Sequence, residues 1–168
     1  CRSFQIPQLC LELTGVENVL VALTVARRGA LSFWRGAYDA DLCDGAMAML
    51  ERFGLADNAE RPVPELPGGV RKLLDIAMAL CRSPRLILLD EPTSGVSVDE
   101  KFPMMDTVLR AMDGSNLTTL FVEHDMDIVS AYAERVIAFY SGRVIADGAP
   151  AQVIADADVR RYVTGTAK

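Results

Sequence analysis

The sequence predicts an α/β fold with a mostly parallel sheet core and a helical subdomain. Two apolar-rich runs predict buried strands: residues 86–89 are continuously apolar, which is typical of a parallel sheet, and residues 117–122 predict a second buried strand. Segments with apolar residues at helical spacing lie before, between and after these runs. Strands that alternate with helices in this way indicate an α/β domain.

The part of the chain up to about residue 80 predicts helices and no good strand, with loop over residues 1–13. Thr14 and Glu17 have the spacing of a capping box and predict a helix that runs to Arg28. A second helix is expected over residues 39–53, and the glycine that follows is the expected stop residue.

A glycine pair, Gly68 and Gly69, opens a third predicted helix that runs to about residue 81. The run at 86–89 follows as a strand expected to be buried on both faces. Ser97 and Glu100 again have capping-box spacing and predict a helix that ends near residue 112.

The last third of the chain predicts a buried strand, a helix, a hairpin and a final helix. The strand is the second apolar run, and residues 125–133 form the helix after it. Strands at 135–140 and 143–146 are expected to be joined by a turn at Ser141 and Gly142. An amphipathic helix is expected over residues 150–163.

The composition is that of a globular chain and not of a nucleic-acid binder. Apolar residues make up 51% of the 168 residues, and the net charge is −6. Basic pairs such as Arg71-Lys72 are scattered and are interpreted as solvated surface. Four cysteines without CxxC spacing and a single histidine favour reduced thiols over a zinc site or a disulfide framework. No apolar run approaches the ~18 residues of a membrane-spanning helix.

The strand at 86–89 leads into two adjacent carboxylates, Asp90 and Glu91, followed by Pro92. Ligands of α/β folds bind at the C-terminal ends of strands, and neighbouring strand residues face opposite sides. Asp90 could therefore hold Mg²⁺ while Glu91 acts as a general base on water. A structural acid pair in a turn before Pro92 explains the same residues, so both interpretations stay open here.

Two further signals have the same double interpretation. His124 follows the second apolar run, where an imidazole could contact a terminal phosphate, although a lone histidine is more often structural. Gly68 and Gly69 would expose backbone N–H groups at the positive end of a helix dipole, which is a natural seat for phosphate. A plain helix start after a proline turn also explains the two glycines.

The order and spacing of these signals resemble the ABC ATPase family. Five motifs stand in the family's order: a Q-loop glutamine at Gln5, a signature motif at residues 66–70, a Walker B strand ending at Asp90 with the catalytic glutamate Glu91, a D-loop from Ser94 to Ser97, and the switch histidine His124. Residues 14–22 and 142–165 are most similar to ATPase subunits of importers for branched-chain amino acids or related amides.

The resemblance implies ATP and Mg²⁺ as cofactors and ATP hydrolysis coupled to transport as the function. The implied partners are a second ABC ATPase subunit, identical or related, and transmembrane permease subunits, with no nucleic acid. The chain would then be cytoplasmic, held on the inner face of the cell membrane through the permease. The implied site residues are Glu91 and His124 for catalysis, Asp90 and Gln5 for the metal, and Gln5, Pro67, Gly68, Gly69, Ser94 and Ser97 for the nucleotide.

Two segments follow from this resemblance: residues 1–82 with the Q-loop and signature, and residues 83–168 with the RecA-like core part. The 168 residues contain no GxxxxGK[ST] loop, which the family places before the Q-loop. We therefore expect a fold without its N-terminal strands and phosphate loop, and no measurable ATP hydrolysis by the chain alone. Pro67, Val70 and Ser97 also replace the family's usual Ser, Gln and Asp.

Two other functions stay open. The first is a catalytically inactive ABC ATPase fragment that is at most a binding module for a partner ATPase, which the missing phosphate loop favours. The second is an ABC ATPase for DNA repair, chromosome organisation or ribosome work. The chain has neither the coiled-coil insertions nor the tandem domains that are typical of that second group.

Overall fold

The computed structural model describes residues 2–3, 8–28 and 40–165. It contains two compact units, Cys1–Val122 and Glu123–Lys168, and each is described by itself. This boundary differs from the predicted division between residues 82 and 83, which followed the motifs and not the packing. The predicted division stays a prediction about functional segments.

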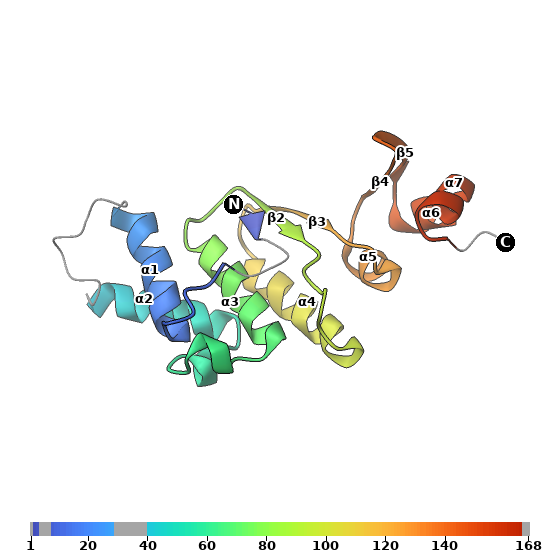
Figure 1. Ribbon diagram of the computed structural model, residues 1–168. Coiled ribbons are helices and arrows are strands. Elements are labelled where there is room, and N and C mark those ends of the chain that lie inside the picture. The colour runs from blue at the N-terminus through green and yellow to red at the C-terminus, as the bar shows by residue number, and fades with distance from the viewer. Residues whose placement is uncertain (1, 4–7, 29–39, 166–168) are drawn as a thin grey trace. The chain divides into compact units, whose positions relative to one another are not determined.

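Three helices precede most of the sheet in the first unit: α1 (Gly15–Arg28), α2 (Ala40–Arg52) and α3 (Gly68–Leu80) (Figure 1). The predicted capping box at α1 is confirmed. The Thr14 N–H donates to Glu17 Oε2 at 2.8 Å, and the Glu17 N–H donates to Thr14 Oγ1 at 3.3 Å. These bonds satisfy two N–H groups that a helix start otherwise leaves free.

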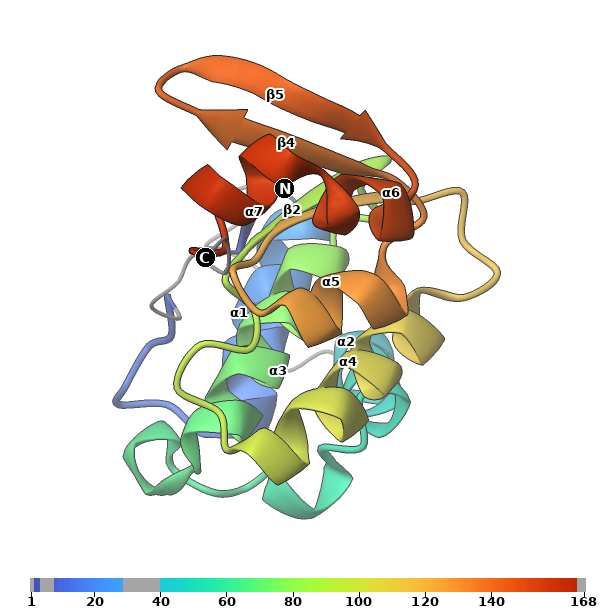
Figure 2. The same cartoon turned by 90° about the vertical axis from the view of Figure 1, so that its right-hand side faces the viewer.

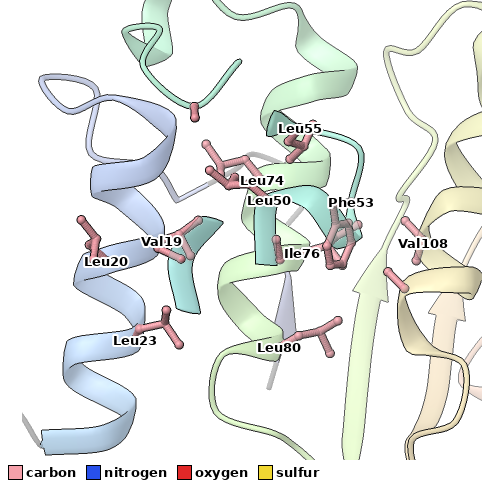
Figure 3. Close-up of a cluster of buried hydrophobic side chains, with 14 of the residues drawn as sticks. Val19, Leu20, Leu23, Leu50, Phe53, Leu55, Leu74, Ile76, Leu80 and Val108 are labelled. Carbon is pink, nitrogen blue, oxygen red and sulfur yellow. The ribbon is translucent and has the colours of Figure 1, made fainter. Parts of the chain in front are cut away.

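Apolar side chains of these helices form the main core of the unit. Two short 3₁₀ turns, Ala56–Asn58 and Val63–Glu65, connect α2 to α3. Figure 3 shows the core side chains gathered between the helices, and all the labelled ones are buried. The residues labelled there are Val19, Leu20, Leu23, Leu50, Phe53, Leu55, Leu74, Ile76, Leu80 and Val108.

The sheet of the first unit has the order β1-β2-β3, and both pairings are parallel. Its strands are β1 (Arg2–Ser3), β2 (Leu86–Asp90) and β3 (Thr118–Val122). The predicted parallel α/β architecture is therefore confirmed. The loop predicted over residues 1–13 is wrong at β1, since a two-residue strand is too short to show any periodicity.

The prediction that β2 is buried on both faces is wrong, as is the prediction that β3 is a buried strand. Ile87 and Leu89 are buried in the core with residues of α3 and of α4 (Val98–Met112). The opposite face is open: Leu86 is 45% exposed and Leu120 is 49% exposed. Continuous apolar runs need a layer on each side, and the described part of this unit supplies helices on one side only.

The predicted start of α4 is correct, but its predicted capping box is not formed. Ser97 precedes the helix, yet its hydroxyl donates to Glu100 Oε2 at 2.6 Å and accepts no helix N–H. The Glu100 N–H instead donates to the Ser97 carbonyl at 3.0 Å. Since the carbonyl takes this donor, the Ser97 hydroxyl is left to pair with the carboxylate.

The second unit is a helix, a hairpin and two short helices (Figure 2). The strands β4 and β5 pair in an antiparallel fashion, and Ser141 and Gly142 both have positive φ at the turn, so the predicted hairpin is confirmed. Asp156 divides the single helix predicted over 150–163, because its side chain accepts N–H groups of the next helix. The elements are α5 (Met126–Tyr132), β4 (Val136–Tyr140), β5 (Arg143–Gly148), α6 (Pro150–Ala155) and α7 (Ala157–Tyr162).

Among the helices within residues 8–28 and 40–165, none combines the length and the apolar composition that crossing a membrane requires.

Candidate functional site

The two predicted site acids lie where β2 leaves the sheet. Asp90 is the last residue of β2 and pairs with Val122 of β3. The Glu91 N–H still donates to the Val122 carbonyl at 2.9 Å, so the ladder continues one residue past the strand. Both acidic residues are partly buried. The alternation along β2 puts Asp90 on the same, open face of the sheet as Leu86.

Glu91 adopts a backbone conformation that is unusual for a residue with a side chain. Its φ is +46°, in the left-handed region, which costs roughly 1–2 kcal/mol for a residue other than glycine. The Ser94 N–H donates to the Glu91 carbonyl at 3.1 Å and closes a turn directly after the acid. Strained backbone of this kind concentrates at functional sites, where neighbouring contacts hold it.

The loop from Glu91 to α4 contains the predicted D-loop residues. Thr93 is almost fully buried, and its carbonyl accepts the N–H of Val96 at 3.2 Å. Ser94 is partly buried, whereas Ser97 is exposed at the start of α4. The structure therefore places Ser94 in the turn next to Glu91, and Ser97 at the far end of the same loop.

The predicted signature residues open α3 and have free space around them. Pro67 is exposed and extended, with φ −56° and ψ 154°, and no side chain caps the helix. A Cβ atom added to Gly68 or Gly69 would meet no heavy atom within 4 Å. Neither glycine has a positive φ, so neither packing nor backbone geometry requires it. Two glycines weaken a helix, and their use here fits a surface that an anion approaches closely.

Two charged residues of α3 reach backbone groups of other segments. Lys72 Nζ donates to the Glu91 carbonyl oxygen at 2.9 Å, and Asp75 Oδ1 accepts the Gln8 N–H at 3.1 Å. The interpretation of the Arg71-Lys72 pair as solvated surface is therefore wrong for Lys72, which is partly buried. The sequence feature that could have revealed these two contacts is the presence of a cation and an anion on a helix whose other residues are mostly apolar.

His124 belongs to the second unit and is exposed. Its N–H donates to Glu123 Oε2 at 3.3 Å, and the next residue, Asp125, caps α5 by accepting the Asp127 N–H at 3.1 Å. The convergence of His124 with Asp90 and Glu91 on one nucleotide involves both units and stays a prediction. The predicted Q-loop glutamine, Gln5, lies outside the described residues.

The residues present fit part of a magnesium-nucleotide site. Within the described ranges, no group of three or more His, Cys, Asp and Glu side chains is arranged to hold a metal by itself. Mg²⁺ at nucleotide sites takes only one or two carboxylates, with phosphates and waters as its other ligands, so Asp90 suffices as the protein's share. The open glycine pair fits a phosphate, but the 168 residues contain no GxxxxGK[ST] cradle.

A strand-end Asp-Glu pair and a glycine-opened helix on a parallel α/β sheet are typical of nucleotide-binding α/β domains. The ABC transporter family model matches residues 3–94, and the chain belongs to this family. Residues beyond that match are also similar to family members, because two comparisons with whole proteins cover nearly the entire chain.

The similar curated proteins include ATP-binding proteins of transport systems. The chain is 32% identical to the high-affinity branched-chain amino acid transport ATP-binding protein LivG of Escherichia coli K12, over 99% of this chain and 68% of that protein. It is 30% identical to BraF of Pseudomonas aeruginosa, which has the same description, over the same shares. Over 86% of the chain it is 33% identical to the phosphonates import ATP-binding protein PhnC 2 of a Nostoc species.

Solved structures of ABC cassettes have the same fold. MJ1267, described as an ATP-binding cassette of an ABC transporter, superposes with a TM-score of 0.80 at 29% identity, over 95% of this chain and 66% of that one. Its ADP conformation gives a TM-score of 0.78 at 30% identity. The predicted ABC ATPase fold is confirmed, and the chain spans about two thirds of the length of these relatives.

Proposed function

We propose that this chain is the part of an ABC importer ATPase subunit that carries the catalytic acid and the signature helix. The observation that supports this most directly is Glu91, which follows the central strand in a strained conformation and is tied to the signature helix by Lys72. The transported substrate in this proposal is a branched-chain amino acid or a related amide, as the names of LivG and BraF suggest.

Each residue has a distinct role in the proposal. Mg·ATP supplies the phosphoanhydride bond whose hydrolysis drives transport. Asp90, at the end of β2, holds the metal, together with Gln5. Glu91 accepts a proton from the attacking water as general base, and His124 contacts the terminal phosphate.

The signature helix acts on a nucleotide bound by a second ATPase subunit. The backbone N–H groups at Gly68 and Gly69, with no side chain in front of them, donate to its phosphate. Pro67 has no hydroxyl to add, so this surface depends on the backbone alone. Ser94 and Ser97 line the loop that faces the partner subunit.

The other partners in the proposal are transmembrane permease subunits. They hold the ATPase on the cytoplasmic face of the membrane, and the nucleotide-driven closing of two ATPase subunits is passed to them. The segment 1–82 provides the contact through the Q-loop, and the segment 83–168 provides the hydrolytic residues. Nucleic acid is not a partner, in keeping with the net charge of −6.

The experiment uses the full-length protein encoded by the complete reading frame that contains this chain. It requires first that this frame is shown to encode a GxxxxGK[ST] loop before Cys1, and it then compares variants of that protein. Glu91→Gln is expected to lower kcat at least about 100-fold while ATP binding persists, because a general base contributes about 10²–10⁴ in rate. Glu51→Gln changes an exposed acid of α2 and is expected to keep normal turnover. Normal turnover in Glu91→Gln would refute the proposed role. The 168-residue chain alone is expected to hydrolyse no ATP.

A second candidate function is a catalytically inactive binding module for a partner ATPase, in which the glycine pair that opens α3 contacts the partner's nucleotide. The DNA upstream of the Cys1 codon separates the two candidates. An in-frame loop of that pattern supports the ATPase, and a stop codon supports the binding module.

A further inference from the structure

Helix α3 holds two backbone segments of the candidate site through side chains of opposite charge. Lys72 Nζ donates to the carbonyl oxygen of Glu91 at 2.9 Å. Asp75 Oδ1 accepts the N–H of Gln8 at 3.1 Å, three residues after the predicted Q-loop glutamine. Lys72 and Asp75 are three residues apart, so both side chains lie on the same side of the helix.

Lys72 contacts the Glu91 carbonyl, the backbone group that also closes the turn after Glu91. The Glu91 N–H is bonded to Val122 in the sheet, so the N-terminal side of the residue is held by β3. Its carbonyl accepts two donors, the Ser94 N–H at 3.1 Å and the Lys72 ammonium at 2.9 Å. A φ of +46° is unfavourable for glutamate, and such a conformation persists only where surrounding contacts determine it.

Helix α3 is itself held in place by its packing against the core. Leu74, Ile76 and Ala77 are almost fully buried in the main core, and Asp75 is only 8% exposed. A hydrogen bond from a charged donor is stronger than one from a neutral donor, so the Lys72 contact is suited to transmit the position of the helix. A fully solvated lysine would be free to point elsewhere, whereas Lys72 is partly buried.

We propose that Lys72 is a positioning residue for Glu91. Its ammonium group holds the Glu91 carbonyl, and with it the left-handed backbone that sets the direction of the carboxylate. Lys72 lies one helical turn after Gly68, so a displacement of the signature end of α3 reaches Glu91 through this hydrogen bond. Asp75 carries the same displacement to Gln8. The inference rests on the proposed role of Glu91 as general base.

The first experiment measures hydrogen exchange in the chain and needs no activity. Lys72→Met removes the donor, Lys72→Arg keeps a cation, and Arg71→Met removes the neighbouring charge as a matched control. In Lys72→Met, amide exchange over residues 91–96 is expected to be at least about 10-fold faster, because a local opening becomes easier. Lys72→Arg is expected to restore most of the protection, and Arg71→Met to preserve it.

Two outcomes would overturn the inference. Unchanged protection over residues 91–96 in Lys72→Met would show that the lysine does not hold the turn. An equal loss of protection in the strand residues 86–90 would show that Lys72 supports the packing in general and has no specific role at Glu91. Circular dichroism of each variant checks that the helices remain folded.

The second experiment uses the full-length ATPase described above. Lys72→Met is expected to lower kcat at least about 10-fold with little change in KM for ATP, because the base is misdirected while nucleotide contacts remain. Lys72→Arg is expected to recover part of the loss. Normal turnover in Glu91→Gln would refute the proposed function itself. Loss of turnover in Glu91→Gln together with normal kcat in Lys72→Met would refute only the positioning role.

Discussion

Asn18 provides the most direct test of how the segment before α1 is held. Its side chain is fully buried and makes three hydrogen bonds to backbone groups. Its Oδ1 accepts the Cys10 N–H at 2.8 Å, and its Nδ2 donates to the carbonyls of Cys10 at 3.1 Å and Thr14 at 2.9 Å. These bonds close residues 10–14 onto the first turn of α1.

Asn18→Ala removes all three bonds, each of which contributes about 1 kcal/mol net. Cys10 is exposed, so water can replace part of the loss there, and the expected destabilisation is about 2–3 kcal/mol. For a chain of this length each kcal/mol lowers Tm by about 2–4 °C, so a drop of about 5–10 °C is expected.

Thermal and urea unfolding followed by circular dichroism measure this effect. Asn116→Ala is the matched control, because Asn116 is exposed in the segment before β3 and its loss should change stability by less than about 0.5 kcal/mol. Asn18→Asp keeps the acceptor but loses both donors and buries a charge, so it should be at least as destabilised as Asn18→Ala at neutral pH. If Asn18→Ala unfolds at the same temperature as Asn116→Ala, the three bonds contribute nothing and the reasoning is wrong.

Two further predictions concern stability and reactivity. A Cβ on Gly15 would lie 2.9 Å from the Asn58 carbonyl oxygen, so Gly15→Ala should destabilise the chain by about 1–3 kcal/mol. A Cβ on Gly45 would lie 3.4 Å from the movable end of Arg27 and in ordinary contact with Leu23 Cδ1 at 3.6 Å, so Gly45→Ala should not destabilise the chain. Equal melting temperatures of the two variants would contradict this reasoning. Burial raises the pKa of the Cys81 thiol to about 11, because the folded state disfavours the charged thiolate. The folded state is therefore stabilised by the neutral thiol. This contribution is fully present below the unfolded-state pKa of about 8.5 and is lost as the pH rises through about 11. At pH 8, iodoacetamide should modify Cys81 at least about 10-fold more slowly than the exposed Cys10, as peptide mass spectrometry would show, and equal rates would contradict the burial.

The helices of the first unit were predictable because their signals are local. Capping-box spacing at Thr14, the glycine stop after α2 and apolar residues at helical spacing act within a few residues of each other. The hairpin at Ser141 and Gly142 was predictable for the same reason, since its turn requires residues that tolerate positive φ.

The exposure of the sheet could not be predicted from the same kind of signal. The run at residues 86–89, which forms most of β2, is apolar at every position, which indicates two covering layers. Whether a layer is present depends on other segments, and the described part of the first unit covers the Ile87 side only. The capping box at Ser97 failed for a related reason, because two acceptors compete for the same donors and the sequence does not rank them.

The same difference between local signals and long-range contacts applies to the candidate site residues. Asp90, Glu91 and the glycine pair were predicted from motif order, and the structure places the two acids at and directly after the end of β2 as expected. Lys72 was missed because its function depends on a contact across 19 residues of sequence. Its neighbour Arg71 has the same charge, so the sequence distinguishes the two residues only by the face of α3 on which each one lies.

The arrangement along α3 explains why one helix could couple several parts of a nucleotide site. Its first residues are glycines that leave the backbone open, its first turn carries the lysine that contacts Glu91, and its next turn carries the aspartate that contacts Gln8. The glycine surface and these two contacts lie within eight residues of a helix whose other side is buried in the core. A helix packed in this way moves as a rigid body, so a ligand that shifts its glycine end must also shift both backbone segments. Substitutions at Lys72 and Asp75 should therefore separate the two connections, since one removes the hydrogen bond to the Glu91 carbonyl, the other removes the hydrogen bond from the Gln8 N–H, and both leave the two glycines unchanged.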